Sequence, residues 1–122
     1  MSRKVVADKP QARFRLRISA GETVAIGPGK IALLEAIGDT GSLTAAAKQL
    51  DMSYRRAWLL LDDLNRALKK PAVASAIGGQ HGGGSQLTET GLALVAHYRS
   101  VEATASEACA PEMRKLLSLL AR

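Results

Sequence analysis

"SLTAAAKQLDMSYRRAW", residues 42–58, is the stretch that decides the fold. Ser42 or Thr44 can cap a short helix that runs through Leu50, and Ser53 can cap a further helix after a short break. The first helix carries alanines, whose small side chains let another helix pack closely against it. The second begins with an aromatic residue and two arginines and continues with apolar residues at steps of three and four. Two helices joined in this way predict a helix-turn-helix.

The sequence before this pair predicts a hairpin and one more helix. Residues 12–18 (ARFRLRI) alternate between apolar and basic side chains, which predicts a half-buried strand. Residues 24–26 (VAI) predict the second strand of the hairpin. A helix is then expected over residues 28–39, because proline suits a first helical turn and Gly41 can end the helix.

The sequence after the pair predicts a projecting hairpin and two more helices. The helix that begins after Ser53 should end near Leu68, and residues 72–88 form two strand-like runs around the glycine-rich tip at 78–84. So many glycines cannot pack, so we expect this hairpin to project as a wing. Thr88 can cap a long helix that reaches Cys109. Pro111 begins a last helix, with apolar residues on one side at Met113, Leu116, Leu117 and Leu120.

This order of elements predicts an α+β, mainly α protein, a winged helix-turn-helix with an N-terminal β-hairpin and C-terminal dimerisation helices. We expect three parts. Residues 1–11 form a disordered tail, because they mix both signs of charge with few apolar groups. Residues 12–110 form the winged helix-turn-helix domain with its long helix, and residues 111–122 form an amphipathic helix.

Composition narrows the class of protein and the kind of partner. The chain has 122 residues, of which 47% are hydrophobic and 3% aromatic, so one domain with an aliphatic, alanine-rich core is expected. A net charge of +6 favours a polyanionic partner, although a basic solvated surface is the alternative. The single cysteine, Cys109, cannot form an internal disulfide. No apolar run is long enough for a membrane span, so we expect a cytoplasmic protein.

The leading turn of the helix after Ser53 is the candidate for reading DNA. In a helix-turn-helix the second helix lies in the major groove, where arginine can bond guanine at two points or hold phosphate. The alternative is that both arginines simply face water. Trp58 is expected to be mostly buried. The residues expected to contact DNA are Ser53, Tyr54, Arg55 and Arg56 of this helix, Thr44 of the preceding one, and Gln80, His81, Gly82, Gly83 and Gly84 of the wing.

Catalytic and metal-binding patterns do not emerge. His81 and His97 have no Cys, Asp or Glu at metal-ligand or triad spacing. The pair at 62–63 (Asp-Asp) is interpreted as a solvated face or as a partner for Lys69 and Lys70. We therefore expect no enzymatic activity, no metal and no cofactor.

A homodimer is expected, because one helix and one wing bury little DNA surface, whereas a two-fold dimer spans half-sites about 34 Å apart. The alternative is that the last two helices fold back on their own domain. The residues expected at the dimer interface are Leu92, Val95, Met113, Leu116, Leu117 and Leu120.

Three segments together resemble the N-terminal DNA-binding domain of the ModE family of molybdate-responsive regulators and, more distantly, the LysR-type winged helix. They are residues 41–58 (GSLTAAAKQLDMSYRRAW), 61–65 (LDDLN) and 78–91 (GGQHGGGSQLTETG). The resemblance implies a homodimeric transcriptional regulator in which Tyr54, Arg55 and Arg56 read double-stranded DNA and Gly82, Gly83 and Gly84 belong to the wing.

The sequence departs from the family in two respects. Asp51 stands where the family commonly has glycine in the turn. Full-length members carry C-terminal molybdate-binding modules, which these 122 residues do not include, so the resemblance does not bring molybdate sensing with it. An effector would bind elsewhere or act through a separate effector-binding protein. The alternative function is binding of an oxyanion, molybdate or tungstate, or a protein-adaptor role on the same fold.

Overall fold

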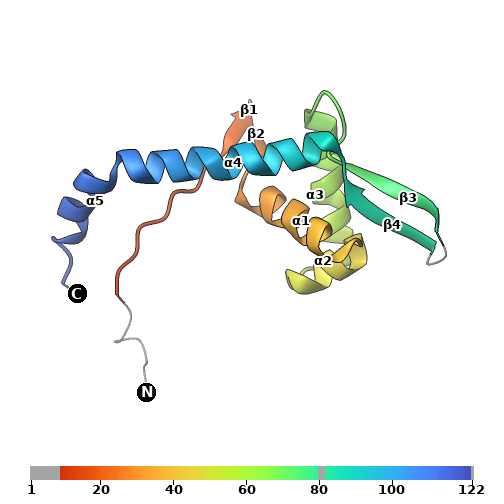
Figure 1. Cartoon of the computed structure of the whole chain (residues 1–122), viewed down its shortest axis with the longest axis horizontal. Helices are drawn as coiled ribbons and strands as arrows, with labels where there is room; N and C mark the ends of the chain where they lie inside the picture. The colour runs from red at the N-terminus through yellow and green to blue at the C-terminus, as the bar shows by residue number, and fades with distance from the viewer. Residues whose placement is uncertain (1–8, 80–81, 122) are drawn as a thin grey trace, which may run out of the picture.

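The computed structural model describes residues 9–79 and 82–121, and its elements follow the predicted order (Figure 1). The expected tail at residues 1–8, together with Gln80 and His81, lies outside the described residues. The elements are β1 (Ile18–Ala20), β2 (Thr23–Ile26), α1 (Pro28–Thr40), α2 (Leu43–Gln49), α3 (Tyr54–Ala67), β3 (Val73–Gly79), β4 (Gly82–Leu87), α4 (Glu89–Ala108) and α5 (Ala110–Leu117).

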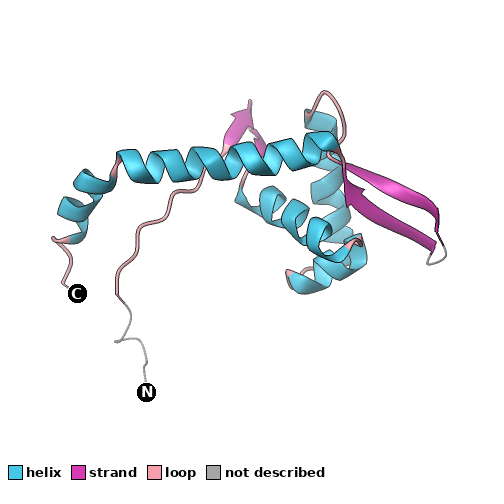
Figure 2. Ribbon diagram, in the orientation of Figure 1, coloured by secondary structure: helices cyan, strands magenta, loops and turns pink. Residues whose placement is uncertain are grey.

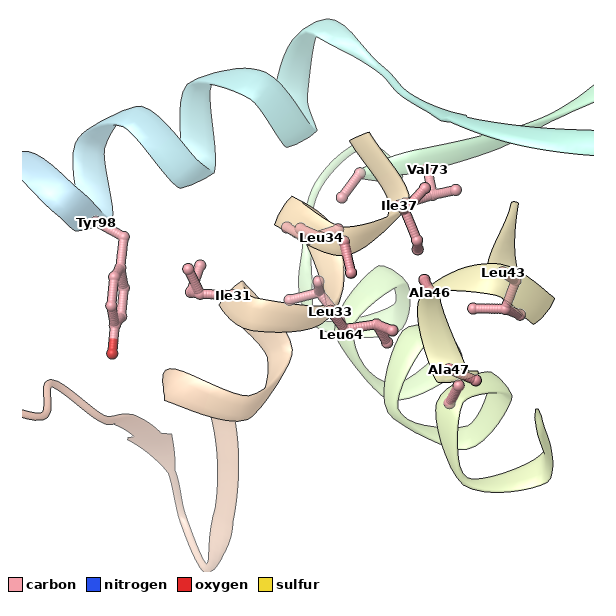
Figure 3. Close-up of a cluster of buried hydrophobic side chains, with 13 residues drawn as sticks. Ile31, Leu33, Leu34, Ile37, Leu43, Ala46, Ala47, Leu64, Val73 and Tyr98 are labelled. Carbon is pink, nitrogen blue, oxygen red and sulfur yellow. The ribbon is translucent and has the colours of Figure 1, made fainter. Parts of the chain in front are cut away.

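The core lies where α1 packs between α2, α3 and α4 (Figure 3). Ile31, Leu34 and Ile37 of α1 recur at helical spacing and are fully buried. On α2 and α3 the facing residues Ala46 and Ala57 are also fully buried, and their small side chains allow the two helices to approach closely. The helix-turn-helix is therefore held by an aliphatic and alanine core, as the composition predicts.

The helix caps confirm the predicted boundaries. The Ser42 hydroxyl accepts the amide of Ala45 at 3.1 Å, so Ser42 rather than Thr44 caps α2. The Ser53 hydroxyl accepts the amide of Arg56 at 3.1 Å at the start of α3. In the turn between these helices Asp51 adopts a left-handed φ of 56°, the conformation for which glycine is better suited.

The β3–β4 hairpin projects from the helical body as a wing (Figure 2). Its base is attached at two points. The Asn65 side chain of α3 accepts the amide of Ala72 at 2.8 Å, and the amide of Ser85 donates to the carbonyl of Gly41 at 3.0 Å. The strands pair from Val73 opposite Leu87 onward. These contacts fix the wing next to α3 and the start of the helix-turn-helix.

The N-terminal hairpin is present, but the prediction of its first strand was wrong. Residues 9–17 have no regular secondary structure, and β1 begins only at Ile18, which is 48% exposed. The alternating side chains do not line a buried sheet face, because β2 has only four residues with which to pair. Instead the segment crosses α4, where the Tyr98 hydroxyl donates to the carbonyl of Leu16 at 2.7 Å.

Helix α4 runs across the body and extends beyond it to α5, on the side opposite the wing (Figure 1). The last helix ends at Leu117, so the prediction that Leu120 lies on its apolar side was wrong. Within the described ranges, no helix combines the length and apolar character that a membrane crossing needs.

Candidate nucleic-acid interface

The N-terminal turn of α3 points its long side chains away from the core. Tyr54, Arg55 and Arg56 are all exposed, whereas Ala57 and Leu64 form the buried side of the helix. At about 100° per residue, Arg55 lies on the side of α3 opposite these two buried residues. The structure therefore places Arg55 near the middle of the outward face, where a groove-binding helix would present it.

Arg56 faces a different direction from Arg55. It lines a groove of about 580 Å³ between α3, α1 and the β1–β2 hairpin, together with Arg17, Lys30 and Asp63. Arg55 does not line this groove, although both arginines border a smaller hollow of about 290 Å³ on α3. The two adjacent arginines thus point to different sides of α3. The groove on the hairpin side also contains Arg17, which lies near Arg56.

Trp58 is not buried, contrary to the expectation from sequence. Its side chain is 47% exposed, and Tyr54 one turn earlier is 54% exposed. Trp58 borders a hollow of about 190 Å³ between α3 and the wing, with Ser75 and Ser85 on the wing side. Helical periodicity alone predicts this exposure, because Trp58 lies about 100° around the helix from the buried Ala57.

Lys30 is a functional position that the sequence analysis missed. Although charged, it is only 7% exposed, and its Nζ donates to the carbonyl of Val24 at 2.7 Å and to that of Ala25 at 3.4 Å. The same ammonium lies 3.7 Å from a carboxylate oxygen of Asp63 on α3. Lys30 therefore ties the N-terminal hairpin to α3.

The two aspartates of α3 pair with neither Lys69 nor Lys70, so this one of the two interpretations from the sequence was wrong. Asp63 pairs with Lys30, and Asp62 pairs with Arg66 one turn later at 3.0 Å. A lysine from α1 and an arginine within α3 are closer in space than the lysines after the helix end. Both carboxylates thus have a cation beside them at the C-terminal half of α3.

The other expected DNA contacts lie on both sides of α3. Thr44 is exposed in the first turn of α2, and Ser53 is exposed while its hydroxyl caps α3. The backbone of Gly82, Gly83 and Gly84 forms the start of β4. These residues share the wing and helix-turn-helix region, and Ser53 borders the same small hollow on α3 as Arg55.

Arg99 and Glu35 hold α4 against α1. The guanidinium donates to both carboxylate oxygens of Glu35, at 2.9 and 2.7 Å, and to Glu102 at 2.7 Å. The bond from Arg99 lowers the pKa of the Glu35 carboxyl, and the two carboxylates, Glu35 first, raise the pKa of Arg99. Burial is the main reason why the pKa of Tyr98 is raised. This cluster is structural support for α4.

The residues expected at a dimer interface do not form one patch on a single chain. Leu92 is exposed beside the wing, whereas Val95 packs against the core of its own chain. At a rise of 1.5 Å per residue, Leu92 near the start of α4 lies roughly 27 Å along that helix from the point where α5, which carries Leu116, begins. On α5 Leu116 is exposed, and Met113 and Leu117 are half-buried.

Ionisable side chains do not gather into a metal-binding group within the part of the chain that the structure describes. His97 is exposed on α4. Cys109 is half-buried at the junction of α4 and α5. The exposed arginines at 17, 55 and 56 lie on and beside α3.

Known proteins of similar sequence are molybdenum-related regulators and binding proteins. The chain is 42% identical over 92 residues to the molybdenum transport protein ModE of Azotobacter vinelandii, a match of 74% of this chain and 34% of that protein. It is 45% identical over 78 residues to the molybdenum-pterin-binding protein MopB of Rhodobacter capsulatus, covering 64% and 29%. It is 33% identical over 88 residues to the DNA-binding transcriptional dual regulator ModE of Escherichia coli, covering 72% and 34%.

These matches confirm the resemblance found in the sequence, because ModE regulators are homologues of this chain. The chain spans about a third of the length of these relatives. No protein-family model matches it.

Two solved structures confirm the winged helix fold. The crystal structure of the CbnR_DBD–DNA complex matches with a TM-score of 0.55 and 19% identity, over 72% of this chain and 95% of that one. ArgP from Mycobacterium tuberculosis matches with a TM-score of 0.51 and 23% identity, over 71% and 30%.

Proposed function

We propose that this chain, a homologue of ModE regulators, binds double-stranded DNA and regulates transcription as a cytoplasmic homodimer, by occupying DNA rather than by catalysing a reaction. The observation that carries the proposal is the leading turn of α3, where Tyr54, Arg55 and Arg56 are exposed beside a projecting wing. A net charge of +6 favours the approach of such a surface to phosphate.

The two arginines take different roles in this proposal. Arg55, on the outward face of α3, would reach the acceptor atoms of guanine in the major groove. Arg56, on the flank that faces the β1–β2 hairpin, would hold phosphate together with Arg17 across their shared groove. Arg55 would therefore select a sequence, whereas Arg56 would position the helix on the duplex.

The wing would contact the DNA backbone next to the groove. Its glycine-rich strand β4 offers amide groups without side chains in front of them, and amides can donate to phosphate oxygens. Because Asn65 and Gly41 bind the base of the wing, the wing keeps a fixed direction relative to α3. We include Gln80 and His81 at its tip and Thr44 and Ser53 at the helix starts among the proposed contacts.

The dimer would form along α4 and α5. The outward side of α4 carries small residues. Helix α5 lies beyond the body of the domain (Figure 1), and Leu116 of this helix and Leu119 and Leu120 after it are exposed. If two α4 helices pack antiparallel, α5 of one copy lies beside the N-terminal end of the other α4, where Leu92 is exposed. A symmetric pair would bury both regions, which lie far apart on one chain.

Arginine variants test the DNA-binding proposal. Genomic fragments are selected on the wild-type protein, and binding to the best fragment and to a random duplex is followed by fluorescence anisotropy. Arg55→Ala should lose about 1–3 kcal/mol on the selected fragment and much less on the random duplex. Arg56→Ala should weaken both equally and reduce the salt slope by about 1.

Arg114→Ala is the matched control, because it removes the same charge from exposed α5, away from α3. It should change neither the affinity for the selected fragment nor the preference for it. Equal losses for Arg55→Ala on both duplexes would remove base reading from the proposal.

Deletion of residues 111–122 tests the dimer. The wild-type chain should have the mass of a dimer by light scattering, and the deletion should have that of a monomer, because it removes the exposed leucines Leu116, Leu119 and Leu120. Leu116→Glu places a charge in the same surface and should also weaken the dimer. A dimer mass retained in both variants would assign the interface to other residues.

Oxyanion binding or a protein-adaptor role is the alternative function. The groove that contains Arg17, Lys30 and Arg56 also contains Glu22 and Asp63, which leaves one excess positive charge for an anion. The names of several relatives refer to molybdenum. Titration calorimetry with molybdate and tungstate, set against a gel shift with the selected fragment, separates the two functions. An effector that acts through a separate protein would leave both results unchanged and alter DNA binding only when that protein is added.

A further inference from the structure

The outward face of α3 carries more apolar surface than a solvent-facing helix needs. Tyr54, Trp58 and Leu59 are 54%, 47% and 47% exposed, and together they form what we name the apolar strip. At about 100° per residue, Arg55 lies between Trp58 and Leu59 around the helix. A cation is therefore flanked by apolar groups on the face that the proposed function directs into the major groove.

The indole of Trp58 lies on the side of α3 that faces the wing. It borders the 190 Å³ hollow whose other wall is formed by Val73, Ser75 and Ser85. With only 47% of its surface exposed, the ring has fewer orientations to lose on binding than a fully exposed one. The remaining half of the ring stays accessible to a partner that approaches α3 and the wing together.

The chemistry of the surroundings selects the partner. Arg55 and Arg56 lie between Tyr54 and Trp58 in the chain, and the net charge is +6, so the partner should be an anion. Double-stranded DNA combines negative charge with an apolar group in its major groove, since the 5-methyl group of thymine projects there. An acidic protein surface does not present an apolar group at a fixed distance from its negative charges.

We propose that the apolar strip, centred on Trp58, contacts thymine 5-methyl groups and so determines part of the sequence specificity. This inference rests on the proposed DNA-binding function. Arg55 would select guanine, and Trp58 would select thymine at a neighbouring base pair on the wing side. Specificity would then come from a polar and an apolar contact on adjacent positions of one helix.

Replacement of thymine by deoxyuridine tests the inference, because it removes only the methyl group. The full chain is titrated with its selected duplex, in which one thymine at a time is replaced. Wild-type protein should bind about fourfold more weakly at one or two positions, the effect of burying about one methyl group. Trp58→Ala should bind thymine and deoxyuridine duplexes equally while keeping the wild-type salt dependence.

Two further variants separate the apolar contact from other roles of the strip. Trp58→Phe keeps an apolar ring and should retain part of the thymine preference. Tyr54→Phe removes only a hydroxyl group and should leave the preference unchanged. Circular dichroism and thermal unfolding of each variant show that the fold is retained, as expected for half-exposed side chains.

Tryptophan emission gives an independent measurement, because Trp58 is the single tryptophan of the chain. Binding of the selected duplex should shield it from acrylamide and shift its emission to shorter wavelength. Strong binding with no thymine preference at any position and with unchanged emission would overturn this inference and leave DNA binding intact. Emission that depends on protein concentration without DNA would assign the strip to a second copy of the chain. Failure to bind any fragment would overturn both proposals.

Discussion

Gly91→Ala should destabilise the fold, because Gly91 is buried where the first turn of α4 packs on the start of the wing. A Cβ atom at this position would lie closer than 3.0 Å to the backbone oxygen of Ala72, a separation that real Cβ atoms do not adopt. The obstructing atom is backbone, and Ala72 itself is fully buried. The same oxygen accepts the amide of Thr88 at 2.9 Å, so α4 cannot move away without losing that bond.

The size of the effect follows from three contributions. Overpacking costs about 1–3 kcal/mol, and loss of the Thr88 bond adds roughly 1 kcal/mol. The greater helix propensity of alanine returns up to about 1 kcal/mol. The net loss is therefore about 1–3 kcal/mol. With an unfolding entropy of roughly 2.1 cal/mol/K per residue, 1 kcal/mol shifts the Tm of a chain of this length by about 4 °C, so Tm should fall by about 4–12 °C.

Gly29→Ala provides the matched control for this substitution. Gly29 also lies in the first turn of a helix, but a Cβ there meets nothing within 4 Å. This variant should gain about 0.5 kcal/mol from helix propensity. Differential scanning calorimetry of the two variants beside the wild type decides the matter. If Gly91→Ala raises Tm as Gly29→Ala does, the close packing of α4 on the wing does not exist in solution.

Substitutions at three other positions test contacts described above. Lys30→Met leaves two hairpin carbonyls without a donor and should lower the urea unfolding free energy by about 1–3 kcal/mol, with faster amide exchange in β2. Asp51→Gly should leave stability unchanged or raise it, whereas Asp51→Ala should lower it by about 1 kcal/mol, because φ is 56°; equal effects would contradict a left-handed turn. Glu35→Gln should cost under about 1 kcal/mol at pH 7, because its bonds to Arg99 are partly exposed. Since these bonds lower the pKa of Glu35 from 4.5, their contribution is present above that value and is lost as the pH falls through the lowered pKa, so wild type and variant should converge in acid.

The helices were predictable because their boundaries depend on neighbouring residues. The serines at 42 and 53 and the threonine at 88 each accept an amide three residues later, and Gly41 ends α1 with a left-handed φ of 74°. Such signals act within one turn of helix, so they can be identified without knowledge of the rest of the fold. The leading turn of α3 as the candidate site follows from the same local signals.

The parts that could not be predicted depend on distant partners. Residues 12–17 alternate like a strand, but the strand opposite is too short, and Leu16 is instead held by Tyr98 of α4. Lys30 occupies a first helical turn, where a lysine is normally solvated, and it is buried only because the hairpin folds over it. Trp58 differs from these, since helical spacing alone would have placed it outside.

The contacts that hold α3 and those that would bind DNA are separate along the helix. Asp63 and Asn65 in the C-terminal half connect α3 to the hairpin through Lys30 and to the wing through a backbone amide. Residues 54–56 at the other end are exposed and rest on the cap from Ser53. Changes in the leading turn should therefore alter binding with little effect on stability. Changes at Lys30 or Asn65 should lower stability and also shift the direction in which α3 presents Arg55, so that affinity falls even though no DNA contact is removed.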